Sequence, residues 1–371
     1  MSTDQAQTLA PRAGKRNPER RDHGRIALEA LERGGLPLLG ALLFLFFTIN
    51  STSGSVFTSH ANITNILGNQ AVTGLVALAM VVPLVAGYFD LSVSATTGVA
   101  NIAIAAFIGT HGWPILPGIL AVLLIGALIG AINGFLVAGL KLNGFVVTLG
   151  TYTLLGGLVQ LYTKGQLITH GIPASFSNWG SQAWLGVPRP FYLLIAVAIV
   201  TWYVVTQVPF GRYLEAIGSN EPAARLVGIN VNRTVWLSFV ASGVIASVAG
   251  ILATSRSGSG SPETGTAFLF PALAAVFLGA TTIKPGRYNV WGTIIGVYFI
   301  AISVSGFTLL GAELWVQPVF NGVSLVVAVA LSTLFARQRE RRSRRSQLAE
   351  IEGDGEGGEA GLVARGRVTS E

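Results

Sequence analysis

The side chains best suited to binding chemistry lie in one short segment of the chain, residues 211–230, with the sequence GRYLEAIGSNEPAARLVGIN. Residues 36–336 contain only fourteen charged side chains, and this segment holds four of them. The four are Arg212, Glu215, Glu221 and Arg225. A buried loop does not hold such charges, and an ordinary surface loop does not need so many small residues. We therefore interpret the segment as a surface that another protein binds.

Residue types that perform catalysis are scattered or missing. Cysteine does not occur, which excludes disulfides, thiol catalysis and cysteine metal sites. The four histidines are far apart in the sequence, and neither paired carboxylates nor a nucleophile–base set accompanies them. The phosphate-binding pattern G-x-x-x-x-G-K-[ST] does not occur either. The sequence therefore predicts a chain that is not an enzyme and that binds no metal or nucleotide itself.

Asp90 has the most unusual position of the acidic residues, in the stretch VAGYFDLSVSATTG between two apolar segments. It can cap the helix that follows, which is the more common role of such a residue, or it can line a transport path. Other polar side chains along the apolar segments are expected mostly to bond neighbouring helices, and the small residues of GALIGAINGFLVAG, 126–139, predict a close helix contact. The candidates for lining a path are Asp90, Ser92, Asn101, Thr148 and Thr151.

The composition indicates that membrane helices position these residues. Hydrophobic residues make up 51% of the 371 residues, charged residues make up 11%, and the mean hydropathy is +0.60. A soluble globular domain carries about a quarter charged residues. The formal net charge of +7 comes mainly from the tails and short connectors. We therefore attribute this charge to membrane topology and expect no binding of nucleic acid.

Apolar runs of about the length that crosses a bilayer predict an all-α polytopic membrane protein. The breaks between the runs give ten candidate transmembrane helices, of which the first and the eighth are short. They cover residues 36–50, 66–87, 91–109, 115–140, 144–162, 191–206, 235–254, 267–280, 289–310 and 318–336. With both termini in the cytoplasm, 21 of the 24 Lys and Arg residues fall on the cytoplasmic side, as the positive-inside rule requires.

The distribution of charge divides the chain into three regions. Residues 1–35 are expected to be a basic cytoplasmic arm, either an amphipathic helix on the membrane surface or a solvated arm. Residues 36–336 form the transmembrane domain, in which residues 207–234 are the longest cytoplasmic connector. Residues 337–371 are expected to form a charged cytoplasmic tail, with a basic part that anionic lipid attracts and a Gly- and acid-rich part that is expected to be disordered.

A short helix, EPAARLV, is predicted inside the long connector. Ser219 or Asn220 can cap this helix, and Glu221 suits the positive end of its dipole. Gly228 then ends the helix. Small and apolar side chains follow one side of it. That side either enters a groove on a partner or packs on the protein's own cytoplasmic face.

The sequence GRYLEAIGSNEPAARLVGINVNRT resembles the cytoplasmic coupling segment of ribose-type ABC importer permeases, whose pattern is approximately G-R-x-x-x-A-I-G-x-N-x-x-A-A-x-x-x-G-I. Three further stretches resemble motifs of that family in the expected order: FDLSV (89–93), FVVTLGTYTLLGGL (145–158) and SRSGSGSPETG (255–265). The resemblance covers residues 36–336. Ser94 replaces a usual glycine, and residues 279–293 replace a glycine-rich connector, so the resemblance does not single out ribose as the solute.

The resemblance implies a subunit of the bacterial plasma membrane that works in a complex. A second permease subunit, identical or related, completes the pore, ABC ATPase subunits use ATP and Mg²⁺, and an extracytoplasmic binding protein delivers the solute, with residues 163–190 as a candidate surface for it. The ATPase-coupling residues that it implies are Gly211, Arg212, Glu215, Ala216, Gly218, Asn220, Glu221, Ala223, Ala224, Arg225 and Gly228.

The function that fits these features is import of a monosaccharide, such as a ribose- or xylose-like sugar or a polyol, driven by ATP hydrolysis in the partner. The alternative is a self-contained secondary transporter that couples a small polar solute to an ion gradient. Secondary transporters usually place ionisable groups in mid-membrane, and this chain has almost none there. An integral membrane enzyme is a third reading, and the missing catalytic sets speak against it.

Overall fold

The computed structural model describes residues 18–334, with side chains from residue 34 onward. Within this part of the chain, eight helices are long and apolar enough to cross a membrane. They are α3 (His60–Val85), α4 (Ser92–Ala105) continued by the π-helix η1 (Ala106–Thr110), α5 (Ile115–Gly134) continued by the π-helix η2 (Phe135–Gly139), α6 (Gly144–Thr163), α8 (Arg189–Thr206), α11 (Val231–Ser257), α14 (Val290–Leu309) and a last helix, Val316–Leu334. Each coincides with a predicted span, which confirms a helical, multi-pass membrane protein.

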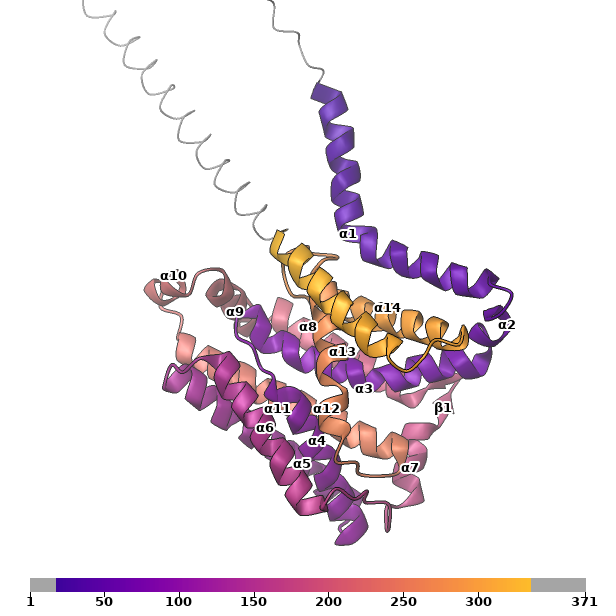
Figure 1. The fold of residues 1–371 in the computed structure, drawn as a ribbon. Helices are drawn as coiled ribbons and strands as arrows, with labels where there is room; N and C mark the ends of the chain where they lie inside the picture. Colours follow the sequence, from indigo (N-terminus) through magenta and orange to yellow (C-terminus); the bar gives the residue numbers. More distant parts are fainter. Residues whose placement is uncertain (1–17, 335–371) are drawn as a thin grey trace, which may run out of the picture.

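The two remaining predicted spans correspond to shorter apolar helices, Gly34–Ile49 and Thr264–Gly279. The first is the second half of α1 (Pro18–Ile49), which begins inside the predicted basic arm instead of at residue 36. Figure 1 shows α1 bent near its middle, and the helix contains Pro37, a residue type that kinks helices. The second comprises α12 (Thr264–Ala267) and α13 (Leu269–Gly279). The predicted tail, 337–371, lies outside the described residues.

Helix α11 is central to the bundle and packs against α3, α4, α5 and the short helix α7 (Ala174–Ser181). Glycines allow its close approach to α5. A Cβ on Gly130 would lie 2.2 Å from the Phe239 carbonyl oxygen, and a Cβ on Gly126 would lie 2.4 Å from the Gly243 carbonyl oxygen. The close helix contact predicted for residues 126–139 is therefore confirmed, with α11 as the partner.

The two ends of the bundle carry different connectors. At one end, α8 leads through α9 (Pro209–Ser219) and α10 (Glu221–Leu226) into α11. At the other end lie α2 (Gly54–Phe57), α7 and a small antiparallel hairpin of β1 (Ala183–Trp184) and β2 (Val187–Pro188). Figure 1 shows α9 and α10 at the left edge and α7 with β1 on the opposite side. The hairpin departs from the all-α prediction, since its two-residue strands lie in a connector.

Candidate functional site

The connector predicted as a partner-binding surface consists of two helices, α9 and α10. The predicted short helix is present as α10, and the side-chain Oδ1 of Asn220 accepts a hydrogen bond of 3.0 Å from the backbone N–H of Ala223. Gly228 follows with φ +85°, a left-handed conformation that glycine adopts without strain. The sequence did not predict α9. Its signal was the apolar spacing of Phe210, Leu214 and Ile217, one face of a helix that packs on the bundle.

Helix α10 has one side on the protein and one side away from it. Ala224 is 3% exposed and belongs to the core that includes Leu214 and Val235. Leu226 and Val227 point away from that core and are 89% and 76% exposed. The two readings of this helix therefore apply to different residues: the Ala224 side packs on the protein's own bundle, and the Leu226 side is free in the described residues.

Polar contacts fix α10 to the turn before α4. The Tyr88 hydroxyl donates to Oε2 of Glu221 at 2.7 Å, and Arg225 forms an ion pair of 2.7 Å with Oε1 of the same carboxylate. Arg225 also donates to Oδ1 of Asn232 at 3.1 Å. These side chains and Lys141 line a cleft of about 270 Å³. A shift of α10 would therefore pull on the 86–91 turn and on the start of α11.

The same contacts set the ionisation of the pair. The Arg225 and Tyr88 hydrogen bonds keep the pKa of the Glu221 carboxyl below its ordinary value. Burial and the bond to Glu221 raise the pKa of Tyr88 to about 12. At neutral pH the tyrosine is thus a donor and the glutamate a charged acceptor, which is the strong form of this hydrogen bond.

Two of the glycines in the connector are required by close backbone approaches. A Cβ on Gly211 would lie 2.0 Å from the Val205 carbonyl oxygen, and a Cβ on Gly218 would lie 2.2 Å from the Val85 carbonyl oxygen. Gly218 thereby seats the end of α9 against the end of α3. Among the other predicted coupling residues, Arg212 is exposed, Ala216 is half-buried, and Glu215 forms a 2.6 Å ion pair with Arg287 from the connector before α14.

Four of the five predicted path residues lie together in a buried polar chain that crosses four helices. Oδ1 of Asp90 accepts from the backbone N–H and the hydroxyl of Ser92 at 3.1 and 2.6 Å. The Ser92 hydroxyl accepts from Nδ2 of Asn133 at 2.8 Å, and Oδ1 of Asn133 accepts from Thr151 at 2.7 Å. The second Asp90 oxygen accepts from Ser242 of α11 at 3.0 Å.

Thr148 belongs to the same region, because its hydroxyl accepts the backbone N–H of Leu91 at 3.1 Å. Asp90 is 4% exposed and its recorded partners are hydroxyl and backbone donors. Its bond to the backbone N–H of Ser92, two residues on, is an Asx-turn contact just before α4, whose N-cap position is Leu91. The arrangement ties α4, α5, α6 and α11 together at one level.

Asn101 lies apart from this chain and organises the loop after α11. Its Oδ1 accepts from the backbone N–H of Ser261 at 2.7 Å and from the Thr264 hydroxyl at 3.2 Å, while its Nδ2 donates to the Thr254 hydroxyl at 2.7 Å. Asn101 is 1% exposed, so it holds the loop from the buried side. The structure therefore places Asn101 away from the other four path candidates.

The loop that Asn101 holds forms part of a cavity of about 500 Å³, here called the Asn321 cavity. Its walls come from α3, α11, the 257–268 loop, α13, α14 and the last helix. Amide and hydroxyl side chains account for nine of its seventeen lining residues, and Arg256 is the charged residue among them. Asn69 and Gln70 lie on α3 and Asn321 lies on the last helix, and the sequence gave no signal that these two distant helices meet here.

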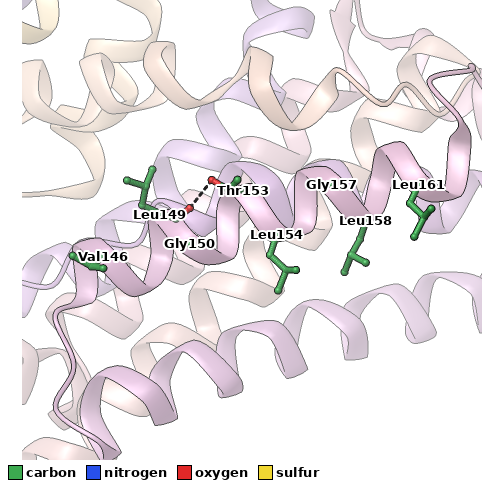
Figure 2. A pocket seen from close by; sticks show the side chains of 8 residues that line it. All are labelled: Val146, Leu149, Gly150, Thr153, Leu154, Gly157, Leu158 and Leu161. Atoms are coloured by element: carbon green, nitrogen blue, oxygen red, sulfur yellow. Dashed lines mark hydrogen bonds between the residues drawn. The ribbon is translucent and has the colours of Figure 1, made fainter.

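A second hollow lies along α6 and is apolar. It has a volume of about 680 Å³ and is lined from Val146 to Leu161 by residues of α6 itself. Figure 2 shows Leu154, Leu158 and Leu161 pointing to the same side of the helix. Thr153 brings a hydroxyl group to the lining of this hollow, and that hydroxyl donates to the Leu149 carbonyl oxygen at 3.1 Å. This face has the chemistry of a lipid or helix contact and offers little to a hydroxylated solute.

The family described as the branched-chain amino acid transport system / permease component matches residues 62–329. The chain belongs to this family. It is 36% identical over 290 residues to the ribose import permease protein RbsC of Haemophilus influenzae, which covers 77% of this chain and 90% of that protein. It is 34% identical to RbsC of Bacillus subtilis, over 80% of this chain and 91% of that protein.

More distant relatives in the family carry names with other sugars. The D-allose transport system permease protein AlsC of Escherichia coli is 29% identical over 296 residues, covering 80% of this chain and 90% of that protein. The xylose transport system permease protein XylH of Escherichia coli is 28% identical, covering 84% of this chain and 94% of that protein. No solved structure is significantly similar to this chain. The family likeness expected from the coupling motif is thus confirmed.

Proposed function

We propose that this chain is the membrane-spanning subunit of an ATP-binding-cassette importer that moves a monosaccharide or similar polyol across the bacterial plasma membrane. The solute is delivered by an extracytoplasmic binding protein, and a second permease subunit completes the pore. ATP and Mg²⁺ act in partner ATPase subunits. The names of the relatives RbsC, AlsC and XylH support a sugar as solute, since the chain covers nine-tenths or more of each.

The observation that carries the coupling role is the exposed apolar pair on α10. Leu226 and Val227 are 89% and 76% exposed on a helix that is otherwise tied to the bundle. Apolar side chains on a rigid, water-facing helix lose unfavourable hydration when a partner covers them. The proposed partner is the ATPase, and its movement would reach the bundle through the Tyr88–Glu221 contact.

The proposed topology has ten crossings with both termini in the cytoplasm. It counts Gly34–Ile49 and Thr264–Gly279 as crossings beside the eight long helices. Support comes from the basic connectors, which gather at the α10 end. Lys141 lines the cleft under α10 with Arg225, and Arg287 pairs with Glu215 of α9. A cluster of bases at one end of the bundle is what the positive-inside rule predicts for the cytoplasmic side.

The alternative function, ion-coupled secondary transport, rests on Asp90. This carboxyl is 4% exposed, and buried acidic groups in membrane bundles often bind the coupling ion. Its three hydrogen bonds from Ser92 and Ser242 give it a structural role that needs no ion. We therefore favour the ATP-driven importer.

Reconstitution into vesicles separates the two functions. The full-length chain is reconstituted with and without the partner ATPase, and uptake of radiolabelled D-ribose, D-xylose and D-allose is measured with binding protein present. We expect uptake only with the ATPase and ATP, and no effect of collapsing the proton and sodium gradients. Concentration of any of these sugars by the chain without ATPase would refute the proposal.

A further inference from the structure

The Asn321 cavity lies at the end of α11 opposite to α10. Helix α11 has 27 residues, about 40 Å at 1.5 Å per residue. Its first residue, Val231, follows the α10 connector, and its last turn carries Arg256, which lines the cavity. The cavity is thus separated from the ATPase-coupling surface by nearly the whole length of the bundle.

Arg256 is held in the cavity wall by contacts with two other helices, α3 and α7. A Cβ on Gly68 would lie 2.6 Å from Nη1 of Arg256, so the glycine leaves room for the guanidinium against α3. Nη1 donates to the Gly180 carbonyl oxygen at 3.4 Å, and Nη2 donates to Oδ1 of Asn69. A guanidinium has five N–H donors, so these two bonds leave further donors for a ligand.

Asn321 gives the cavity an unsatisfied acceptor. The residue is 6% exposed, and its Oδ1 is buried without a hydrogen-bond partner. Buried side-chain amides normally have hydrogen-bond partners, and a buried acceptor without a hydrogen bond costs free energy. Asn321 lines the Asn321 cavity, so a ligand hydroxyl in that space can donate the missing bond.

The remaining wall offers nothing to a cation and suits a hydroxylated molecule. None of the described residues that line the cavity is Asp or Glu, so nothing there pairs with an ammonium group. Gln70, Gln317 and Ser261 also line the cavity and offer both donors and acceptors, which matches a hydroxyl group that is itself both. Phe268 adds an aromatic surface. The volume of about 500 Å³ lies within the usual range for small-molecule sites, about 300–1,000 Å³.

We propose that the Asn321 cavity binds the transported solute as an uncharged polyhydroxylated molecule, with Asn321 as acceptor and Arg256 as donor. This inference rests on the proposed sugar import and adds the place where the solute first binds the permease. The Oδ1 atom of Asn321 accepts from a solute hydroxyl, and the free N–H groups of Arg256 donate to a neighbouring solute oxygen. A binding protein docked on the 163–190 loop would release its sugar close to this cavity, because Ile168 pairs with Gly260 in the cavity loop.

The test measures direct binding by the full-length chain in lipid nanodiscs. Saturation-transfer difference NMR is recorded with D-ribose, D-xylose and D-allose, and with L-leucine as the probe of the amino-acid class. The test variant is Asn321→Leu, which keeps the branching and the number of side-chain heavy atoms and removes an unpartnered oxygen, so its melting temperature should not fall. The matched control is Ser247→Ala, because Oγ of Ser247 is also buried and unpartnered but belongs to α11 outside the cavity.

We expect a saturation signal from at least one sugar and none from leucine. Asn321→Leu should weaken sugar binding and slow ATP-driven uptake about tenfold, as one lost hydrogen bond to a ligand and the intrusion of a methyl group imply. Ser247→Ala should leave both unchanged. If Asn321→Leu melts at a lower temperature than the wild type, Gln317→Leu at the exposed cavity edge replaces it, and we expect the same weakening of sugar binding and uptake.

The outcomes separate this inference from the proposed function. Sugar binding and uptake by the cavity variant equal to those of wild type would refute the site while leaving sugar import intact. A leucine signal without a sugar signal would refute the solute class. Sugar binding that Asn321→Leu abolishes, without ATP-driven uptake by the wild-type complex, would support the site and refute the importer.

Discussion

Removing the exposed apolar side chains of α10 is the most direct perturbation of the proposed coupling surface. The double variant Leu226→Ala/Val227→Ala truncates two side chains that are 89% and 76% exposed. The bundle loses no core contact, because Leu226 is the last residue of α10, Val227 is its C-cap, and neither belongs to the core. The fold and melting temperature of the isolated chain should therefore stay as they are.

The expected effect on ATPase binding follows from the apolar area that the partner would cover. Full burial of one leucine or valine contributes about 1.5–3 kcal/mol, so truncating both to alanine should cost about 3 kcal/mol of association free energy. This corresponds to about a hundredfold increase in Kd, since each 1.4 kcal/mol is tenfold. A charge at Ala224 is a poorer test, because Ala224 is 3% exposed and a charge there would disturb the chain's own core.

The assay is titration of purified ATPase onto the nanodisc-embedded chain, followed by surface plasmon resonance. The matched control is Leu124→Ala/Val200→Ala, which truncates the same residue types where they are 70% and 62% exposed on membrane helices α5 and α8. We expect the control to bind the ATPase as the wild type does. Unchanged ATPase affinity of the α10 variant would refute the assignment of α10 as the docking helix.

The remaining predictions concern the contacts that carry α10 movement into the bundle. Tyr88→Phe removes the 2.7 Å bond to Glu221, so we expect normal ATPase binding but less sugar moved per ATP hydrolysed, measured by parallel uptake and phosphate release. The lowered pKa of Glu221 means that its stabilising contribution is full above the ordinary glutamate value of about 4.3 and is lost as the pH falls through the lower folded value. The melting-temperature difference between wild type and Glu221→Gln should thus be constant above about pH 5 and shrink below about pH 4; a difference that grows on acidification would contradict this. Gly218→Ala should destabilise the chain by about 1–3 kcal/mol in thermal unfolding, because its Cβ would lie 2.2 Å from the Val85 carbonyl oxygen. Gly150→Ala, with open space around the added Cβ, should be neutral or slightly stabilising in the same measurement. Asp90→Asn keeps an acceptor for Ser92, so ATP-driven uptake should persist within about threefold, as expected for the loss of one hydrogen bond of ordinary strength; complete loss of uptake with an intact fold would favour an ion-coupling role.

The membrane helices could be predicted from the sequence because their signal is local. A run of apolar residues must cross the bilayer as a helix, since lipid offers no partner for backbone groups. The signal for α10 was also local, because Asn220 caps its start and Gly228 follows its end. For the basic arm the sequence left a helix and a solvated arm open, because charged residues can continue a helix outside the bilayer as well as end one; the helix α1 begins at Pro18.

The contacts between distant segments could not be predicted in this way. The sequence singled out Asp90 and Ser92, which are neighbours, but nothing in it indicated that Ser242 would lie within 3.0 Å of the same carboxylate. Asn101 was grouped with the path residues because it is polar and lies on an apolar helix. Its partners come from the loop more than 150 residues later, and tertiary packing alone decides that pairing.

Helix α11 connects the proposed coupling surface at α10 with the Asn321 cavity. The helix starts beside α10, and near its middle the Ser242 hydroxyl donates a hydrogen bond to Asp90. Its last turn carries Arg256, which lines the cavity. A helix is stiff along its axis, and its glycine contacts with α5 leave no space to absorb a displacement. Under the proposed coupling, a push on α10 would move α11 together with the helices tied to Asp90, and this movement would reshape the Asn321 cavity. In the proposed importer the force would enter at one end of α11 and act on the solute at the other, so the change would need no ion bound by this chain.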